Sequence, residues 1–185
     1  MEVIYEYRDY KIILEEKPNK TAIQLLHTTL WGTNGPIFEH LDTAEKVDHL
    51  SKSLAFSLEK NGRTIGTCTV LEREITVEGK KYRTWYGRYF TIDKQYQGSI
   101  FGGILLKYIK AHMESISNLP TIFYVYVDQA NPRSSKLLKY IGFEIIFLKY
   151  PKIRRLDQLI LQSARTTYLM HNLRLIYYQH QQSTN

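Results

Sequence analysis

The segment Gln95–Gly103 has residue types that can hold a phosphate group. Its sequence, QYQGSIFGG, contains three glycines and a serine and precedes an amphipathic stretch. Small residues let a backbone approach a ligand, and free amides at a helix N-terminus bind phosphate oxygens with help from the helix dipole. The spacing is not the Rossmann glycine pattern, and the Gly-Lys-Ser/Thr of a P-loop is absent. The residue types alone leave two interpretations, a phosphate cradle and a plain glycine-containing turn.

A helix with clear start and stop signals follows a buried strand further along the chain. Thr121–Val127 is a nearly continuous apolar, β-branched and aromatic run, which is typical of a strand covered on both faces. Asn131 is a good N-cap, Pro132 fits the first helical position, and Gly142 suits the helix stop. These signals predict a helix over Pro132–Ile141.

Together the two segments resemble the GNAT superfamily of acyl-CoA-dependent N-acetyltransferases. The pyrophosphate-binding signature of that family is Gln/Arg-x-x-Gly-x-Gly/Ala, and Gln95–Gly98 fits its first half. The later pattern of the family is Asn-x-x-Ala-x-x-Leu-Tyr-x-x-x-Gly-Phe, which is matched at Asn131, Leu137, Gly142 and Phe143. The resemblance covers residues 54–143 well and the whole chain in the order of its elements.

The resemblance implies acetyl-CoA as co-substrate and a site that binds it. Backbone groups of one strand would pair with the pantetheine arm in a gap between neighbouring parallel strands: Phe90, Thr91 and Ile92. Backbone amides of the following loop would hold the pyrophosphate: Gln97, Gly98, Ser99, Ile100, Phe101, Gly102 and Gly103. Asn131 and the start of its helix would line the far side of the cofactor.

Three positions depart from the family pattern. Ile100 stands where the signature has Gly or Ala, and Ser134 replaces a small Ala. Leu138 occupies the position at which many members carry the tyrosine that protonates the departing thiolate. Tyr140 is the candidate acid in its place, but it lies two residues further on, about 200° around a helix, and packing on the sheet is its alternative role.

The acceptor amine must lose a proton before it can attack a thioester, so a carboxylate or an ordered water is needed nearby. The strand before the loop offers Thr84, Tyr86 and Arg88 at alternating positions and no Glu among them. Glu39 and His40, between the first two expected helices, are candidates, with surface or capping roles as the alternative. The sequence does not single out a base.

The elements that must position these residues indicate an α/β (α+β) fold. Asn61-Gly62 and Glu78-Gly79 predict two successive hairpins, and therefore an antiparallel meander. The strand that ends near Asp93, a helix over 104–116 and the strand at 121–127 form a β-α-β unit with parallel strands. We expect a GNAT-like central mixed, mostly antiparallel sheet flanked by helices. The other predicted elements are strands at 11–15, 143–150 and 166–173 and helices at 22–31, 44–53 and 156–164.

Length and composition predict a single globular domain over residues 1–185. Hydrophobic residues make up 43% of the chain and charged residues 23%, which excludes a disordered or low-complexity class. No apolar run approaches the roughly 20 residues of a membrane span, and the N-terminus is charged where a signal peptide is apolar. The single cysteine, Cys68, suits a small core residue and a reducing compartment. We therefore expect a cytoplasmic protein.

The net charge of +7 is concentrated in a basic C-terminal segment from about residue 151. Such a segment can attract nucleic acid, anionic lipid or an acidic partner, and a solvated surface is the alternative. No nucleic-acid-binding motif accompanies it, and the 15 tyrosines follow strand patterns. The six histidines lack the spacing of metal ligands, so no metal is inferred.

The functional hypothesis is an N-acetyltransferase that passes the acetyl group of acetyl-CoA to a primary amine by direct attack in a ternary complex. The acceptor would be a small-molecule or peptide amine. The alternative is a non-catalytic acyl-CoA-binding or interaction module, since Leu138 replaces the usual acid. A third hypothesis is transfer of a longer acyl chain. Separately, the aromatic-rich edges and the basic segment would allow a homodimer.

Overall fold

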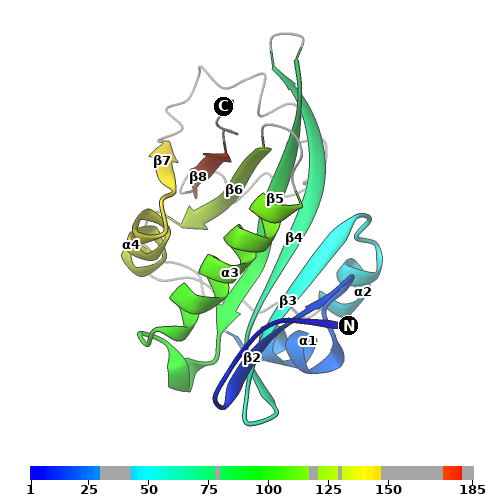
Figure 1. Cartoon of the computed structure of the whole chain (residues 1–185), viewed down its shortest axis with the longest axis vertical. Coiled ribbons are helices and arrows are strands. Elements are labelled where there is room, and N and C mark those ends of the chain that lie inside the picture. Colours follow the sequence, from blue (N-terminus) through cyan, green and yellow to red (C-terminus); the bar gives the residue numbers. More distant parts are fainter. Residues whose placement is uncertain (30–42, 78–79, 117–120, 129–130, 147–172, 181–185) are drawn as a thin grey trace.

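A computed structural model describes residues 1–29, 43–77, 80–116, 121–128, 131–146 and 173–180 of the chain. Within them, eight strands form one sheet in the order β1-β2-β3-β4-β5-β6-β8-β7 (Figure 1). The strands are β1 (Glu2–Tyr7), β2 (Tyr10–Glu15), β3 (Ser53–Lys60), β4 (Arg63–Val77), β5 (Lys80–Ile92), β6 (Thr121–Asp128), β7 (Glu144–Ile146) and β8 (Leu173–His180). The helices are α1 (Lys20–His27), α2 (Thr43–Asp48), α3 (Phe101–Ser115) and α4 (Pro132–Tyr140), and a 3-10 turn covers Lys94–Tyr96.

The antiparallel meander is confirmed. Strands β1 to β5 pair with their sequence neighbours in antiparallel fashion. Asn61 and Gly62 take φ values of +48° and +74°, the left-handed conformations that a two-residue hairpin turn requires. Val77 pairs with Lys80, so the second hairpin also forms, although its turn residues lie outside the described part of the chain.

The predicted β-α-β unit is present as β5, α3 and β6. Strand β6 pairs with β5 in parallel, from Arg83↔Thr121 to Gly87↔Val125. Helix α3 lies along one face of the sheet (Figure 1), where it packs on β3, β4 and β5 and buries one side. The residues of α3 that pack on the sheet are Leu105, Leu106, Ile109 and Met113. The expected mixed, mostly antiparallel sheet flanked by helices is therefore confirmed.

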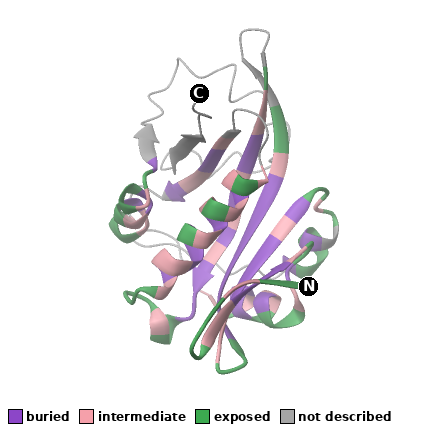
Figure 2. Cartoon of the chain, in the orientation of Figure 1, coloured by how far each residue is buried: buried purple, intermediate pink, exposed green. Residues whose placement is uncertain are grey.

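The sheet has a different cover on each face. Side chains alternate between the faces of a strand, and Phe56, Trp85 and Phe123 share a core cluster with α3 and α4. On the other face, Leu26 of α1 and Val47 of α2 pack on Tyr89 of β5. Buried residues accordingly follow the central strands and the inner sides of the helices (Figure 2).

Several predicted boundaries were wrong or incomplete. Strand β1 was not predicted; it is an edge strand, and its burial pattern lacks a buried position. Helix α2 ends at Asp48 instead of reaching residue 53, because Ser53 already pairs with Leu71 in the sheet. Helix α3 begins at Phe101, three residues before the predicted start.

The end of the chain is described only in part. Strand β8 begins at Leu173, where the predicted final strand at 166–173 was expected to end, and it pairs with β7. It also pairs with β6 along its whole length, so it lies inside the sheet. The predicted helix at 156–164 and most of the predicted strand at 166–173 fall outside the described residues. The basic segment from about 151 thus contains an inner strand of the sheet.

Candidate functional site

Strands β5 and β6 separate at the point where they approach the glycine-bearing loop. Their paired register ends at Gly87↔Val125, whereas β5 continues to Ile92 and β6 to Asp128. Phe90, Thr91 and Ile92, the predicted pantetheine partners, lie in the part of β5 that has no β6 partner in this register. The site therefore contains a gap between two parallel strands, in which the end of β5 has no partner on that edge among the described strands.

A glycine and a bulge mark the start of this gap. A Cβ atom at Gly87 would lie 2.6 Å from Cγ1 of Val125, so only glycine allows the strands to pair this closely there. Immediately afterwards the β4–β5 register shifts, because Thr67 pairs with Thr91 and Thr69 with Arg88. Tyr89, inside this bulge, has a φ of +52°. The bulge changes the direction of β5 just where β6 leaves it.

The loop after β5 is held to the sheet by polar contacts at its start. Arg63 donates to Asp93 at 2.7 Å, and the Gln95 amide donates to the same carboxylate at 3.0 Å. The side chain of Gln97 donates to the Ile92 carbonyl at 2.9 Å. Gly98 then turns the chain with a φ of +82°. These contacts fix where helix α3 begins.

Part of this loop presents unpaired donors. The amides of Gln97 and Ser99 donate to backbone carbonyls, and the Phe101 amide donates to Oγ of Ser99 at 3.4 Å. No acceptor among the described residues serves the remaining four amides, those of Gly98, Ile100, Gly102 and Gly103. Ile100, just before the helix, takes a helical backbone conformation and is 71% exposed. Such a set of donors at a helix N-terminus suits an anionic phosphate.

The loop and the gap adjoin each other and helix α4. A Cβ atom at Gly102 would lie 3.6 Å from Cγ1 of Ile92 and 3.4 Å from Cδ2 of Leu137. Asn131 caps α4 by accepting from the Ser134 amide at 3.0 Å, and Gly142 ends it with a φ of +92°, as predicted. The structure therefore brings the end of β5, the start of α3 and α4 together.

The predicted acid and base positions have different surroundings. Leu138 is buried in the core, whereas Tyr140 is 87% exposed at the C-terminal end of α4. This exposure does not favour Tyr140 as a proton donor to a group inside the sheet. Glu39 and His40 lie outside the described residues. Cys68 is buried, and burial raises the pKa of its thiol to about 12, which agrees with a core role.

An aromatic and cationic cluster, of which the sequence pointed only to Tyr86 and Arg88, lies on the face opposite α3. The rings of Tyr86 and Tyr124 stack with centroids 5.1 Å apart, and Tyr126 meets Tyr86 edge-on at 5.6 Å. The guanidinium carbon of Arg88 lies 5.9 Å from the Tyr86 ring centroid and 4.7 Å from that of Tyr89. The alternation of Tyr86 with Arg88 and of Tyr124 with Tyr126 was visible, but only the parallel register shows that they meet.

Hydroxyl groups line the same face beside the bulge. Oγ1 of Thr29, just after α1, lies 3.1 Å from Oγ1 of Thr91. Thr67 pairs with both Thr91 and Ser57 in the sheet, which makes a row of three polar side chains beneath α1. The Thr67 and Ser57 hydroxyls are buried without a hydrogen-bond partner among the described residues. The environment on this side of the bulge is therefore polar.

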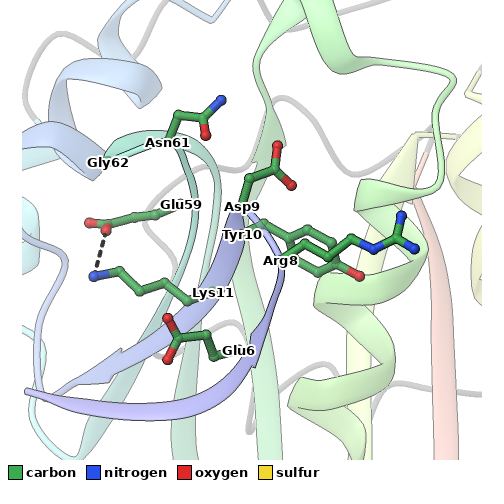
Figure 3. Close-up of a pocket in the computed structure, with 8 residues that line it drawn as sticks. All are labelled: Glu6, Arg8, Asp9, Tyr10, Lys11, Glu59, Asn61 and Gly62. Carbon is green, nitrogen blue, oxygen red and sulfur yellow. Dashed lines mark ion pairs between the residues drawn. The ribbon is translucent and has the colours of Figure 1, made fainter.

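A separate pocket lies between the β1–β2 and β3–β4 turns (Figure 3). Of the charged side chains that line it, Lys11 pairs with Glu59 at 3.3 Å, and Asp9 pairs with Lys60 beside the pocket. No group of three or more metal-ligating side chains occurs within the described ranges. None of the described helices is long and apolar enough to cross a membrane.

The family model of the acetyltransferase (GNAT) family matches residues 17–143 of this chain. The chain belongs to the GNAT family. Membership implies an acyl-CoA-dependent acetyltransferase, as the loop and helix motifs predicted. No curated protein matches the chain.

Solved GNAT structures share the fold. A spermidine N-acetyltransferase chimera from Vibrio cholerae and hSSAT is 18% identical, covers 90% of this chain and 93% of its own, and superposes with a TM-score of 0.58. Spermidine N-acetyltransferase from Vibrio cholerae in complex with CoA and spermine is 16% identical, with 91% and 95% covered and a TM-score of 0.56. The Campylobacter jejuni N-acetyltransferase PseH is 14% identical, with 94% and 100% covered and a TM-score of 0.54.

Proposed function

We propose that the protein transfers the acetyl group of acetyl-CoA to a primary amine by direct attack in a ternary complex. The observation that carries the proposal is the gap after Gly87↔Val125, which opens beside a helix start where four amides have no acceptor among the described residues. A long, polar, anionic co-substrate needs both features, an edge for its amide-bearing arm and donors for its phosphates. Acetyl-CoA has this constitution.

The residues predicted from the sequence fall into two groups, one for the pantetheine arm and one for the pyrophosphate. The free edge of β5 at Phe90, Thr91 and Ile92 would pair with the pantetheine arm as an added strand. The amides of Gly98, Ile100, Gly102 and Gly103 would bind the pyrophosphate, with Gln97, Ser99 and Phe101 shaping the loop. Asn131 would act through the position of α4, because its side-chain oxygen is engaged in the cap.

The chemical step needs little beyond positioning. The amine nitrogen forms a bond to the acetyl carbon and gives up a proton to solvent, the carbon–sulfur bond breaks, and the electron pair leaves with sulfur, which takes up a proton to become the free thiol. A thiol has a pKa of about 8.5, so the thiolate is an acceptable leaving group near neutral pH. Backbone amides directed at the thioester oxygen stabilise the charge that develops there. Holding amine and thioester together supplies much of the remaining rate enhancement.

Calorimetry with acetyl-CoA tests the cofactor site. Gly98→Trp places a bulky group in front of the free amides and should abolish binding. Gly62→Trp is the matched control, because Gly62 also has a positive φ and open space around its missing Cβ. It shares the backbone strain of the first variant but lies in the β3–β4 turn. Equal loss of affinity in both variants would count against the cradle.

Thiol release with a panel of amines tests the transfer itself. Wild-type protein should release CoA only when an acceptor is present, because attack in a ternary complex forms no acetyl-enzyme. If the protein binds acetyl-CoA and acetylates no amine, the alternative hypothesis of a non-catalytic acyl-CoA-binding module is correct. If it binds no acetyl-CoA, the fold has another use.

A further inference from the structure

Arg88 is a partly buried cation for which the described residues provide no counter-charge. It is the first residue of β5 after the last pair with β6, so it lies at the opening of the gap. Its described contacts are the rings of Tyr86 and Tyr89, and none of the ion pairs among the described residues includes it. A guanidinium has five donors, and aromatic faces satisfy none of them fully. Its free donors can therefore bind a ligand.

The carboxylates of the neighbouring strand lie on the opposite face. Glu72 is opposite Trp85, which belongs to the α3 core, and it pairs with Arg83 at 2.8 Å. Glu74 pairs with Lys81 at 2.8 Å. Arg73, between them, is opposite Thr84 and therefore shares the face of Arg88. Within the described side chains, this face carries two cations and no carboxylate from β4 or β5.

The tyrosine rings beside Arg88 form an uncharged wall. Tyr86 and Tyr124 stack with an interplanar angle of 13°, and Tyr126 stands at 78° to the Tyr86 ring. Burial is the largest cause that raises the pKa of Tyr86, and it raises the pKa of Tyr124 to about 12. These phenols stay neutral at physiological pH and cannot neutralise the guanidinium.

We propose that the amine acceptor carries an anionic group, a carboxylate or a phosphate, that pairs with Arg88 while its apolar part lies against Tyr86 and Tyr124. This rests on the proposed function, since an acceptor must reach the gap that would hold the acetyl group. Arg88 supplies a planar fork that matches either anion with two parallel hydrogen bonds. A polycation such as spermine, which a solved neighbour binds, would meet two arginines and be repelled.

Matched acceptor pairs that differ only in the anionic group test this proposal. Glycine, β-alanine, γ-aminobutyrate and ε-aminocaproate are each compared with the corresponding amide, and O-phosphoethanolamine with ethanolamine. Spermidine is the polycationic probe. For wild type we expect kcat/KM to favour one anionic member over its neutral partner by about tenfold or more, as for a charged hydrogen bond. The carboxylate and phosphate arms show which anion fits.

Two arginine variants test whether Arg88 causes the preference for an anionic acceptor. Arg88→Gln should reduce the anion preference to near unity, mainly through KM, while the Kd for acetyl-CoA changes less than about twofold. Arg8→Gln is the matched control, because Arg8 also lies over a tyrosine ring, at 5.0 Å, but in the β1–β2 turn. It should leave both quantities unchanged.

The outcomes separate the two proposals. Preference for spermidine or for the neutral amides, a preference that survives Arg88→Gln, or no turnover of any anionic amine would each overturn the assignment of Arg88. If wild-type protein does not bind acetyl-CoA, the proposed function itself is wrong. Calorimetry detects this before any acceptor is added.

Discussion

The absence of a side chain at Gly87 allows β5 and β6 to pair closely at the start of the gap. Its alanine variant would place a Cβ atom 2.6 Å from Val125 at the last β5–β6 pair. We expect Gly87→Ala to lower the free energy of unfolding by about 1–3 kcal/mol, because the strands must move apart to accommodate it. Urea denaturation measures this loss.

Gly103→Ala provides the comparison for that experiment. A Cβ atom there would make an ordinary contact, 3.6 Å from Cδ1 of Leu137, and alanine favours a helix over glycine. Its free energy of unfolding should stay constant or rise by up to about 1 kcal/mol. An equal loss in both variants would show that close packing at Gly87 is not the cause.

Cys68 should be inert in the folded protein. Its side chain is 1% exposed, and burial raises the pKa of the thiol to about 12, so almost no thiolate is available at pH 8. A disulfide reagent should label the native protein far more slowly than the urea-unfolded protein. Rapid native labelling would mean that the strand around Cys68 opens readily.

At the scale of single residues, the sequence predicted correctly the caps and turns that depend only on neighbouring residues. Asn131, Gly142 and the Asn61-Gly62 turn follow from capping and positive φ, which neighbouring residues decide. The cluster around Arg88 could not be found in this way. Tyr86 and Tyr124 are 38 positions apart in the sequence, and only the parallel register joins them.

At the scale of elements, two asparagine caps allow a controlled test of α4. Asn131 accepts from the Ser134 amide at 3.0 Å, and Asn19 caps α1 by accepting from the Ala22 amide at 2.9 Å. Alanine at either position should cost about 1 kcal/mol of stability. Only Asn131→Ala should also weaken acetyl-CoA binding, because α4 adjoins the loop. Calorimetry showing equal affinities for the two variants would contradict the role of α4.

Most elements were predicted, and the errors occur where long-range pairing outweighs local pattern. The β5–α3–β6 unit carries strong periodicity, so its type and order followed from the sequence. Strand β1 is stabilised by pairing with β2 and has little buried surface to reveal it. Helix α2 ends earlier than predicted because Ser53 already belongs to strand β3. No local rule places β8 between β6 and β7.

The whole molecule should lose stability in alkaline solution. Burial raises the folded-state pKa values of Cys68 and Tyr124 to about 12, whereas the unfolded groups titrate near 8.5 and 10. Above these lower values the unfolded state binds fewer protons than the folded state, so the free energy of unfolding falls as pH rises. Urea midpoints should drop steadily between about pH 8.5 and 11.

Variants identify the groups responsible for this slope. Cys68→Ala should flatten the profile from about pH 8.5, and Tyr124→Phe from about pH 10. Tyr140→Phe, a change at a phenol that is 87% exposed, serves as the control and should leave the profile as it is. A wild-type profile that stays level to pH 11 would contradict the buried-acid explanation.

The position of β8 also imposes an order on biosynthesis. Translation delivers β6 and β7 before β8, yet β7 joins the sheet only through β8 in the described pairing. At about 5–20 residues per second, the ribosome needs several seconds to extend the chain from the end of β6 to the end of β8. Until β8 is made, the edge of β6 that it covers has no partner among the described strands. We expect nascent chains that stall in this interval to be strong substrates for chaperones and to aggregate when chaperones are scarce.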